Sequence, residues 1–280
     1  MTSVAVLERF SIVCPLGVRL RDEATGEPVR DSLSVVVYPA SQPELRTSGV
    51  PNHSGVFVFR NLPGLRELEN GSGDAAWWAA QITRFPFMLE VRDLSGRYLP
   101  FRLPVQLPQR RILSLDLSST PPLQGGGEDG SLPLFSSPTR ATPDGMGVLR
   151  AELLDSGTLQ PASWAVIEAT AGQQRLLRGM ADREGRVMLP LFYPRPVISL
   201  GSPGTGNTPL TQQTWAVDFT VRYRRREPVP EIPDLADVLA QPAATVLEQT
   251  SPLAPWTRAT LQFGRELRAA LLITPAGSPP

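Results

Sequence analysis

The chain is poor in the residues that most often build catalytic and metal sites. It contains one cysteine, one histidine and no lysine among 280 residues, so all 27 basic residues are arginine. The single Cys14 excludes an internal disulfide and any metal site built from several cysteines, and it favours a reducing compartment. No apolar run is long enough to predict a helix that crosses a bilayer.

An excess of charge of either sign is also missing. The 27 basic residues are balanced by 27 acidic ones, so no overall field draws the chain to nucleic acid or to anionic lipid. Residues 1–9 carry no basic stretch at their start, and Glu8 interrupts the apolar residues that follow. They are therefore not expected to act as a secretion signal.

What the chain does contain is turn residues and short strand-like segments. It has 30 prolines and 23 glycines, and segments rich in β-branched and aromatic residues lie between them. Three such segments in the first half have counterparts of similar order in the second half. They are Val18–Asp22, Leu33–Tyr38 and Gly55–Phe59, matched by Leu149–Asp155, Trp164–Glu168 and Gly185–Leu189.

The spacing of turn residues supports this duplication. Asp22 precedes Pro28 by the same interval at which Asp155 precedes Pro161, and the strand-like segment at Phe87 has its counterpart at Trp215. We therefore predict an all-β fold in which one β-sandwich unit occurs twice.

The domain boundaries follow from the composition. Residues 1–118 are predicted to form the first sandwich, 119–145 a Pro/Gly-rich linker with an extended arm, and 146–280 the second sandwich. A long insertion at 224–256 is expected to be irregular, apart from a short helix at 235–240 that Asp234 begins. Residues 4–16 are predicted to form a leading strand or a further arm.

The search for catalytic chemistry gives little. A Ser–His–Asp set needs a histidine that a carboxylate holds close to a serine, and only His53 is present, in the turn before Gly55. A solvent-exposed turn histidine is the favoured interpretation, and a hydrolase that uses His53 stays a third alternative.

Metal and cofactor sites are equally poorly supported. Acidic pairs occur at 22–23, 67–69 and 182–184, but all are expected in turns or loops as solvated residues. The glycine-rich residues 201–208 lack the lysine of a phosphate-binding loop. We therefore predict no metal, no cofactor and no enzymatic activity.

Protein interfaces are better supported than active sites. The adjacent tryptophans are predicted either to anchor a loop on the core of their own domain or to lie at a protein–protein contact. The apolar side chains of the extended arm need burial, which a neighbouring subunit would provide. The run of three arginines is suited to ion pairs with an acidic protein partner. The candidate interface residues are Trp77, Trp78, Leu132, Leu134, Phe135, Arg140, Arg224, Arg225 and Arg226.

Two resemblances add to this reading. The segments Asp22–Pro28 and Gly55–Gly64 resemble the carboxypeptidase-regulatory-like, or transthyretin-type, β-sandwich. Gly96–Arg102 and Leu134–Arg140, taken with Leu149–Leu153 and Pro161–Ala165, are similar to a family of proteins encoded with phage-tail-like extracellular contractile injection systems. The second resemblance covers most of the chain, but not the insertion at 224–256.

The resemblance implies a structural subunit without catalytic residues or cofactor. It implies a cap adaptor that joins tube or sheath to the terminal cap, or a baseplate accessory protein, arranged as a six-fold ring. Assembly would be cytoplasmic, and the particle would then be released from the cell. The alternative from another class is a secreted or surface β-sandwich module that binds carbohydrate or protein.

Overall fold

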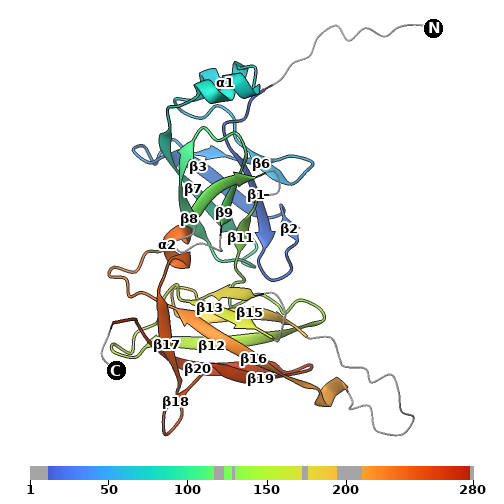
Figure 1. Ribbon diagram of the computed structural model, residues 1–280, viewed down its shortest axis with the longest axis vertical. Coiled ribbons are helices and arrows are strands. Elements are labelled where there is room, and N and C mark those ends of the chain that lie inside the picture. The colour runs from blue at the N-terminus through green and yellow to red at the C-terminus, as the bar shows by residue number, and fades with distance from the viewer. Residues whose placement is uncertain (1–11, 117–122, 128–129, 172–175, 194–209, 278–280) are drawn as a thin grey trace, which may run out of the picture.

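The computed structural model describes residues 12–116, 123–127, 130–171, 176–193 and 210–277. The fold is all-β, with two sandwiches placed end to end and one short helix between them (Figure 1). The expected leading arm lies largely outside the described residues, as does the glycine-rich stretch 201–208.

The first sandwich packs a seven-stranded sheet against a four-stranded sheet. The larger sheet has the order β10-β9-β1-β6-β5, with β2 and β11 both paired to β1, and the smaller has the order β4-β3-β7-β8. Its elements are β1 (Gly17–Asp22), β2 (Pro28–Val29), β3 (Leu33–Pro39), β4 (Thr47–Ser48), β5 (Val50–Pro51), β6 (Val56–Val58), the 3-10 helix η1 (Arg66–Asn70), α1 (Ala75–Ala80), β7 (Phe85–Asp93), β8 (Phe101–Leu107), β9 (Ile112–Asp116), β10 (Leu123–Gly127) and β11 (Leu132–Leu134).

The second sandwich is a nine-stranded sheet folded into two layers. Strand β16 pairs with β19 along its first half and with β17 at its end, so the layer containing β13 and β16 continues into the layer containing β20 and β12. Its elements are β12 (Met146–Asp155), β13 (Val166–Thr170), β14 (Leu177–Met180), β15 (Arg186–Phe192), η2 (Leu210–Gln212), β16 (Thr214–Arg222), α2 (Leu235–Leu239), β17 (Ala243–Glu248), β18 (Ala254–Pro255), β19 (Arg258–Gln262) and β20 (Glu266–Thr274).

The two sandwiches share one topology. In the first, β1 is antiparallel to β6 and parallel to β9; in the second, β12 is antiparallel to β15 and parallel to β20. The other layer repeats in the same way, because β7 lies between β3 and β8 as β16 lies between β13 and β19, all antiparallel. The predicted duplication is therefore present in the strand pairing as well as in the sequence.

The hydrogen bonds of the turn after β1 recur in the turn after β12. The Asp22 carboxylate accepts the backbone N–H groups of Ala24 and Thr25, and the Asp155 carboxylate accepts those of Gly157 and Thr158. These bonds close an Asx-type turn, which explains why aspartate stands at both positions. The fourth residue after each aspartate has a positive φ, 79° at Gly26 and 56° at Leu159.

The predicted linker is wrong at the two places where its described residues form strands. Strand β10 pairs antiparallel with β9, and β11 pairs parallel with β1, so both strands complete the first sandwich. The predicted irregular insertion is also wrong in part, because β17 lies inside the second sheet between β16 and β20.

The predicted short helix is confirmed. It is α2, and the Asp234 carboxylate accepts the backbone N–H groups of Ala236 and Asp237 at its start. Leu235, Val238 and Leu239 are buried in the same cluster as the core of the first sandwich. Helix α2 thus belongs to the second half by sequence, but it packs on β8 of the first (Figure 1).

Candidate functional site

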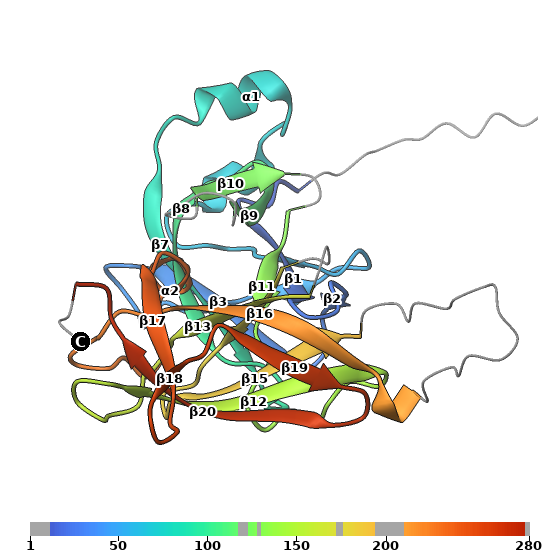
Figure 2. The ribbon, with the colours of Figure 1, turned by 60° about the horizontal axis from the view of Figure 1, so that its bottom comes forward.

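The tryptophan pair lies on α1, at the end of the first sandwich that faces away from the second (Figure 2). Asp74 caps this helix by accepting the N–H of Trp77 at 2.8 Å. The two indole rings make an edge-to-face contact with centroids 4.9 Å apart, and a Cβ at Gly71 would overlap the Trp77 ring. Trp77 therefore packs on its own loop, while both tryptophans stay half-exposed.

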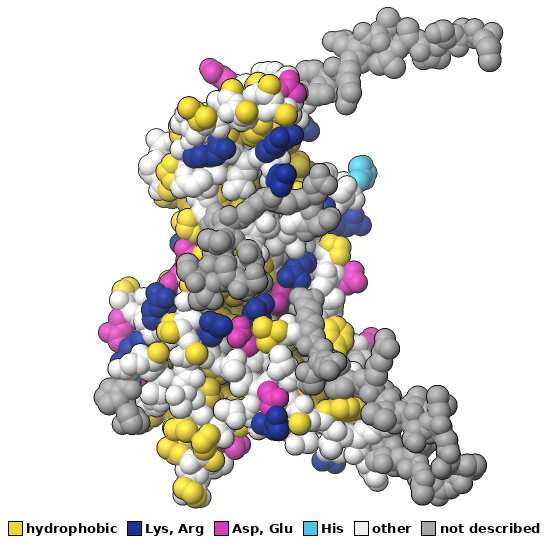
Figure 3. Space-filling view, in the orientation of Figure 1, with side chains coloured by type: hydrophobic (Ala, Val, Ile, Leu, Met, Phe, Trp, Pro, Cys, Tyr) yellow, Lys and Arg dark blue, Asp and Glu magenta, His cyan; other side chains and the backbone are white. Residues whose placement is uncertain are grey.

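Other apolar side chains near α1 are more exposed than the tryptophans. Ile82 is 84% exposed and Phe85, at the start of β7, is 41% exposed. Hydrophobic side chains are visible on this end of the molecule in Figure 3.

The predicted arm is not free to dock on a neighbouring subunit. Leu132, Leu134 and Phe135 are buried in the first core. Strand β11 holds them there, because Leu20 is in register with Leu132 and the Leu99 N–H donates to the Phe135 carbonyl at 2.9 Å. The apolar side chains of the arm are covered by their own chain, so the prediction that they form an intersubunit contact is corrected.

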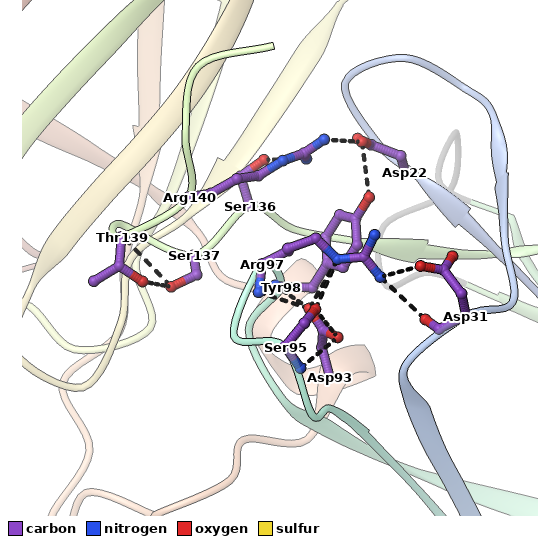
Figure 4. A network of polar contacts seen from close by, with 10 residues as sticks. All are labelled: Asp22, Asp31, Asp93, Ser95, Arg97, Tyr98, Ser136, Ser137, Thr139 and Arg140. Carbon is purple, nitrogen blue, oxygen red and sulfur yellow. Dashed lines mark hydrogen bonds and ion pairs between the residues drawn. The ribbon is translucent and has the colours of Figure 1, made fainter.

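Arg140 is also engaged within the chain. Its guanidinium donates to Asp22 at 2.6 Å and to the Ser136 hydroxyl at 2.9 Å, and it lies over the Tyr98 ring (Figure 4). The Tyr98 hydroxyl donates to the same Asp22 carboxylate at 3.0 Å. Arg140 therefore fixes the arm to the first turn of the repeat, and its predicted role as an interface residue is corrected.

The predicted arginine run is paired with carboxylates of this chain. Arg224 and Arg226 both bind Asp237, at 3.0 and 2.8 Å, and Arg225 binds Asp155 at 2.6 Å. The proposal that this run pairs with an acidic partner is therefore replaced by internal ion pairs. These bonds tie the end of β16 to α2 and to the turn after β12.

The two sandwiches carry matching sets of aspartate, tyrosine and arginine. Asp22, Tyr98 and Arg140 form the first set, and Asp155, Tyr223 and Arg225 form the second. Burial and the charge of the neighbouring aspartate raise the pKa of both tyrosines to about 12. Burial alone would raise the pKa of Asp155, but hydrogen bonds from Arg225 and the turn N–H groups lower it.

A cluster that sequence reasoning missed lies on the outer face of the sheet β4-β3-β7-β8. Glu90, in the middle of β7, accepts hydrogen bonds from Arg46 at 2.7 Å, Arg92 at 3.0 Å and Arg102 at 2.9 Å. Burial would raise the pKa of Glu90, but these arginines lower it. A charged residue between the inward positions Leu89 and Val91 is the signal that could have found it.

The expected turn positions of the histidine and of two acidic residues are observed, but the expectation that these acidic residues are solvated is wrong, because Asp22 and Asp182 are buried. His53 is exposed in the turn before β6, and Asp22 and Asp182 cap the turns that follow β1 and precede β15. Among the described residues, no group of three or more histidine, cysteine, aspartate or glutamate side chains could hold a metal ion. Within the same residues, no helix is long and apolar enough to cross a membrane.

Comparison with known proteins identifies no family. No family model and no curated protein matches the chain. Among solved structures, the shaft pilin SpaA from Lactobacillus rhamnosus GG aligns at 11% identity, with 95% of this chain and 99% of the pilin covered and a TM-score of 0.21. A single-residue variant of that pilin aligns at 10% identity over 95% and 99% of the two chains, with a TM-score of 0.22. At these TM-scores the likeness supports no conclusion about this chain.

Proposed function

We propose that this protein is a non-enzymatic structural adaptor of a phage-tail-like contractile injection particle. Its place in the particle is the cap end, where it joins tube or sheath to the terminal cap, and it assembles there as a six-fold ring. Assembly takes place in the cytoplasm, and the particle is released afterwards. The resemblance of the sequence motifs to that family is the reason for proposing that the chain belongs to such a particle. The geometry of the chain supports its role as an adaptor.

The observation that carries the proposal is the continuous core between the two sandwiches. Trp164, Met180 and Leu235, all from the second half, are buried in one cluster with Leu134 and Phe135 of the first. Tandem modules that bind ligands independently are usually joined by an exposed linker with a small polar interface. A shared core instead fixes the distance and angle between the outer faces, as a spacer between subunits requires.

Buried polar bonds hold together the residues of the second half that face this junction. Gln241 is fully buried; its amide N–H groups donate to the carbonyls of Trp164 and Val238, and its amide oxygen accepts from Arg224 and Arg226. Buried polar groups satisfied in this way favour one arrangement, because any displacement would leave several of them without partners.

The proposal is tested in cells that produce the particle and carry an epitope-tagged copy of this chain. We expect the tagged chain to sediment with tube and sheath proteins, and its deletion to give particles of abnormal length or without a closed end. Normal particles in the deletion strain, with the tagged chain left in the soluble fraction, would contradict the proposal. Recovery of the chain outside cells without any particle would favour the alternative, a secreted or surface-binding module.

A further inference from the structure

We propose that the outer face of the sheet β4-β3-β7-β8 is a docking surface for an acidic segment of a partner protein. The carboxylates of that segment would bind Arg46, Arg92 and Arg102, which gather around Glu90. The inference concerns the surface itself and holds whether or not the partner belongs to a contractile particle.

The alternation of the strands places these side chains on the outer face. Leu89 and Val91 point into the core of the first sandwich, so Glu90 and Arg92 between and beside them point outward. Arg102 is directly opposite Glu90 on β8. Glu90, Arg92 and Arg102 are therefore built on strands of a sheet, which hold them more firmly than a loop would, and Arg46 comes from the loop before β4.

The cluster carries more positive than negative charge. Three guanidinium groups share one carboxylate, which is only 4% exposed, while the side chains of Arg46, Arg92 and Arg102 remain 43%, 45% and 41% exposed. A guanidinium has five N–H donors, and each of these arginines gives Glu90 one of them. The remaining donors are suited to carboxylates that approach from solvent.

A further carboxylate that pairs with an arginine of the cluster is weakly held. Glu231 lies 3.9 Å from Arg92, and its side chain is 79% exposed. An incoming carboxylate can displace it at little cost, since exposed ion pairs contribute little to stability. Among the other described carboxylates, the largest number of paired arginines is two, so the excess at Glu90 is larger. The carboxylates with two are those of Glu23, Glu168, Asp237 and Glu266.

The arginines are held in place before a partner arrives. Glu90 fixes all three guanidiniums, and Arg46 also lies over the Tyr38 ring, 4.8 Å from its centroid. Ordering flexible side chains is one of the main costs of association, so a preformed arrangement favours binding. Arginine, tyrosine and methionine are enriched at protein interfaces, and Met88 lies half-buried on the same face.

A groove beside the cluster indicates the chemistry that would follow the acidic residues of the segment. It has a volume of about 560 Å³, and Met88 and Arg102 line it together with Pro228, Pro230 and Ile232 from the chain between β16 and α2. Arg224 and Arg226 also line it, with Glu227, Asp234 and Asp237. These three carboxylates would repel further acidic residues from the groove itself, as they would a nucleic-acid backbone. The segment that fits is thus a short run of acidic residues followed by apolar ones.

The test uses a fluorescein-labelled peptide of six glutamates followed by two leucines, with binding measured by fluorescence anisotropy on the purified full chain. We expect the double variant R46Q/R92Q to bind at least ~10-fold more weakly than the wild type. The matched control is R258Q/R268Q, which removes the same charge at exposed arginines of β19 and β20 and should bind within about twofold of the wild type. Melting temperatures of both variants check that the fold is intact.

Three results would overturn the inference. Equal weakening in both double variants would indicate attraction by general charge alone. Wild-type affinity no higher for the glutamate peptide than for a glutamine peptide of equal length would exclude a carboxylate site. Tighter binding of oligo-dT than of the peptide would point to nucleic acid instead of a protein segment.

Discussion

At the scale of single residues, the duplicated turn uses its aspartate for more than turn formation. In each sandwich the carboxylate that closes the turn also binds an arginine from a distant segment, Arg140 in the first and Arg225 in the second. A charge-assisted hydrogen bond inside a partly buried site is stronger than a neutral one. The turn that Asp22 or Asp155 forms can therefore be recognised from neighbouring residues, but the arginine that pairs with the aspartate comes from a distant part of the chain.

The tyrosines in these sets should make stability depend on alkaline pH. Their folded pKa is about 12, whereas an unfolded tyrosine has a pKa of about 10. Between these values the unfolded chain releases protons that the folded chain keeps, so the free energy of unfolding falls as pH rises. We expect the Y98F/Y223F variant to lose about 1 kcal/mol per hydroxyl at pH 9, and to show a smaller further loss at pH 11 than the wild type.

Urea unfolding followed at both pH values measures this difference. A double variant whose stability falls between pH 9 and pH 11 as steeply as that of the wild type would contradict the assignment. The single variants should each remove part of the pH dependence, because Tyr98 and Tyr223 lie in different sandwiches.

At the scale of elements, the sequence predicted those turns and helix starts that depend on residues close together in the chain. The Asp22 turn, its repeat at Asp155 and the helix begun by Asp234 depend on contacts within a few residues, and all three are present. The pairing of β11 and β17 within the two sandwiches could not be predicted from such local patterns. Pairing of β11 with β1 joins segments more than a hundred residues apart. The sequence of a proline-containing apolar segment is the same whether its own chain or another chain covers it, so the sequence does not distinguish the two cases.

The same limit applied to the candidate site. Arg224 to Arg226 were recognisable as a charged run, but their carboxylate partners Asp155 and Asp237 come from different elements. Glu90 and Arg102 are brought together only by the register of β7 and β8. From the sequence alone, an arginine that is free in solvent cannot be distinguished from one that pairs within the chain, because the pairing depends on the strand register.

The position of β11 gives a prediction at this scale. Leu134 is fully buried and in register with Asp22, so L134D places a carboxylate in the first core. We expect a loss of about 4 kcal/mol or more in the free energy of unfolding, measured by urea titration. The control L94D changes an exposed turn leucine and should shift stability by less than about 0.5 kcal/mol.

A folded L134D monomer of normal stability would contradict the burial of β11 in its own sandwich. It would revive the idea of an arm that docks on a neighbouring subunit. The comparison is informative because both variants exchange the same leucine for the same aspartate, and only the burial of the site differs.

At the scale of the whole molecule, the junction decides whether the chain behaves as one body or two. Helix α2 comes from the second half and packs on β8 of the first, and the Arg102 N–H donates to the Pro233 carbonyl at 2.8 Å just before it. Ion pairs cross the same boundary, since Arg178 lies between Glu23 and Glu168. Because both apolar and polar contacts span the junction, unfolding of one sandwich removes support from the other.

We therefore expect the wild-type chain to unfold in a single calorimetric transition, and Q241A to separate it into two. Truncating Gln241 leaves the Trp164 carbonyl without its N–H donor and the Arg224 backbone N–H without its acceptor, at a cost of about 1–3 kcal/mol per unsatisfied group. The control Q249A alters an exposed glutamine and should keep one transition. Two transitions already in the wild type would mean that the sandwiches unfold independently, and the chain could not then act as a spacer of fixed length.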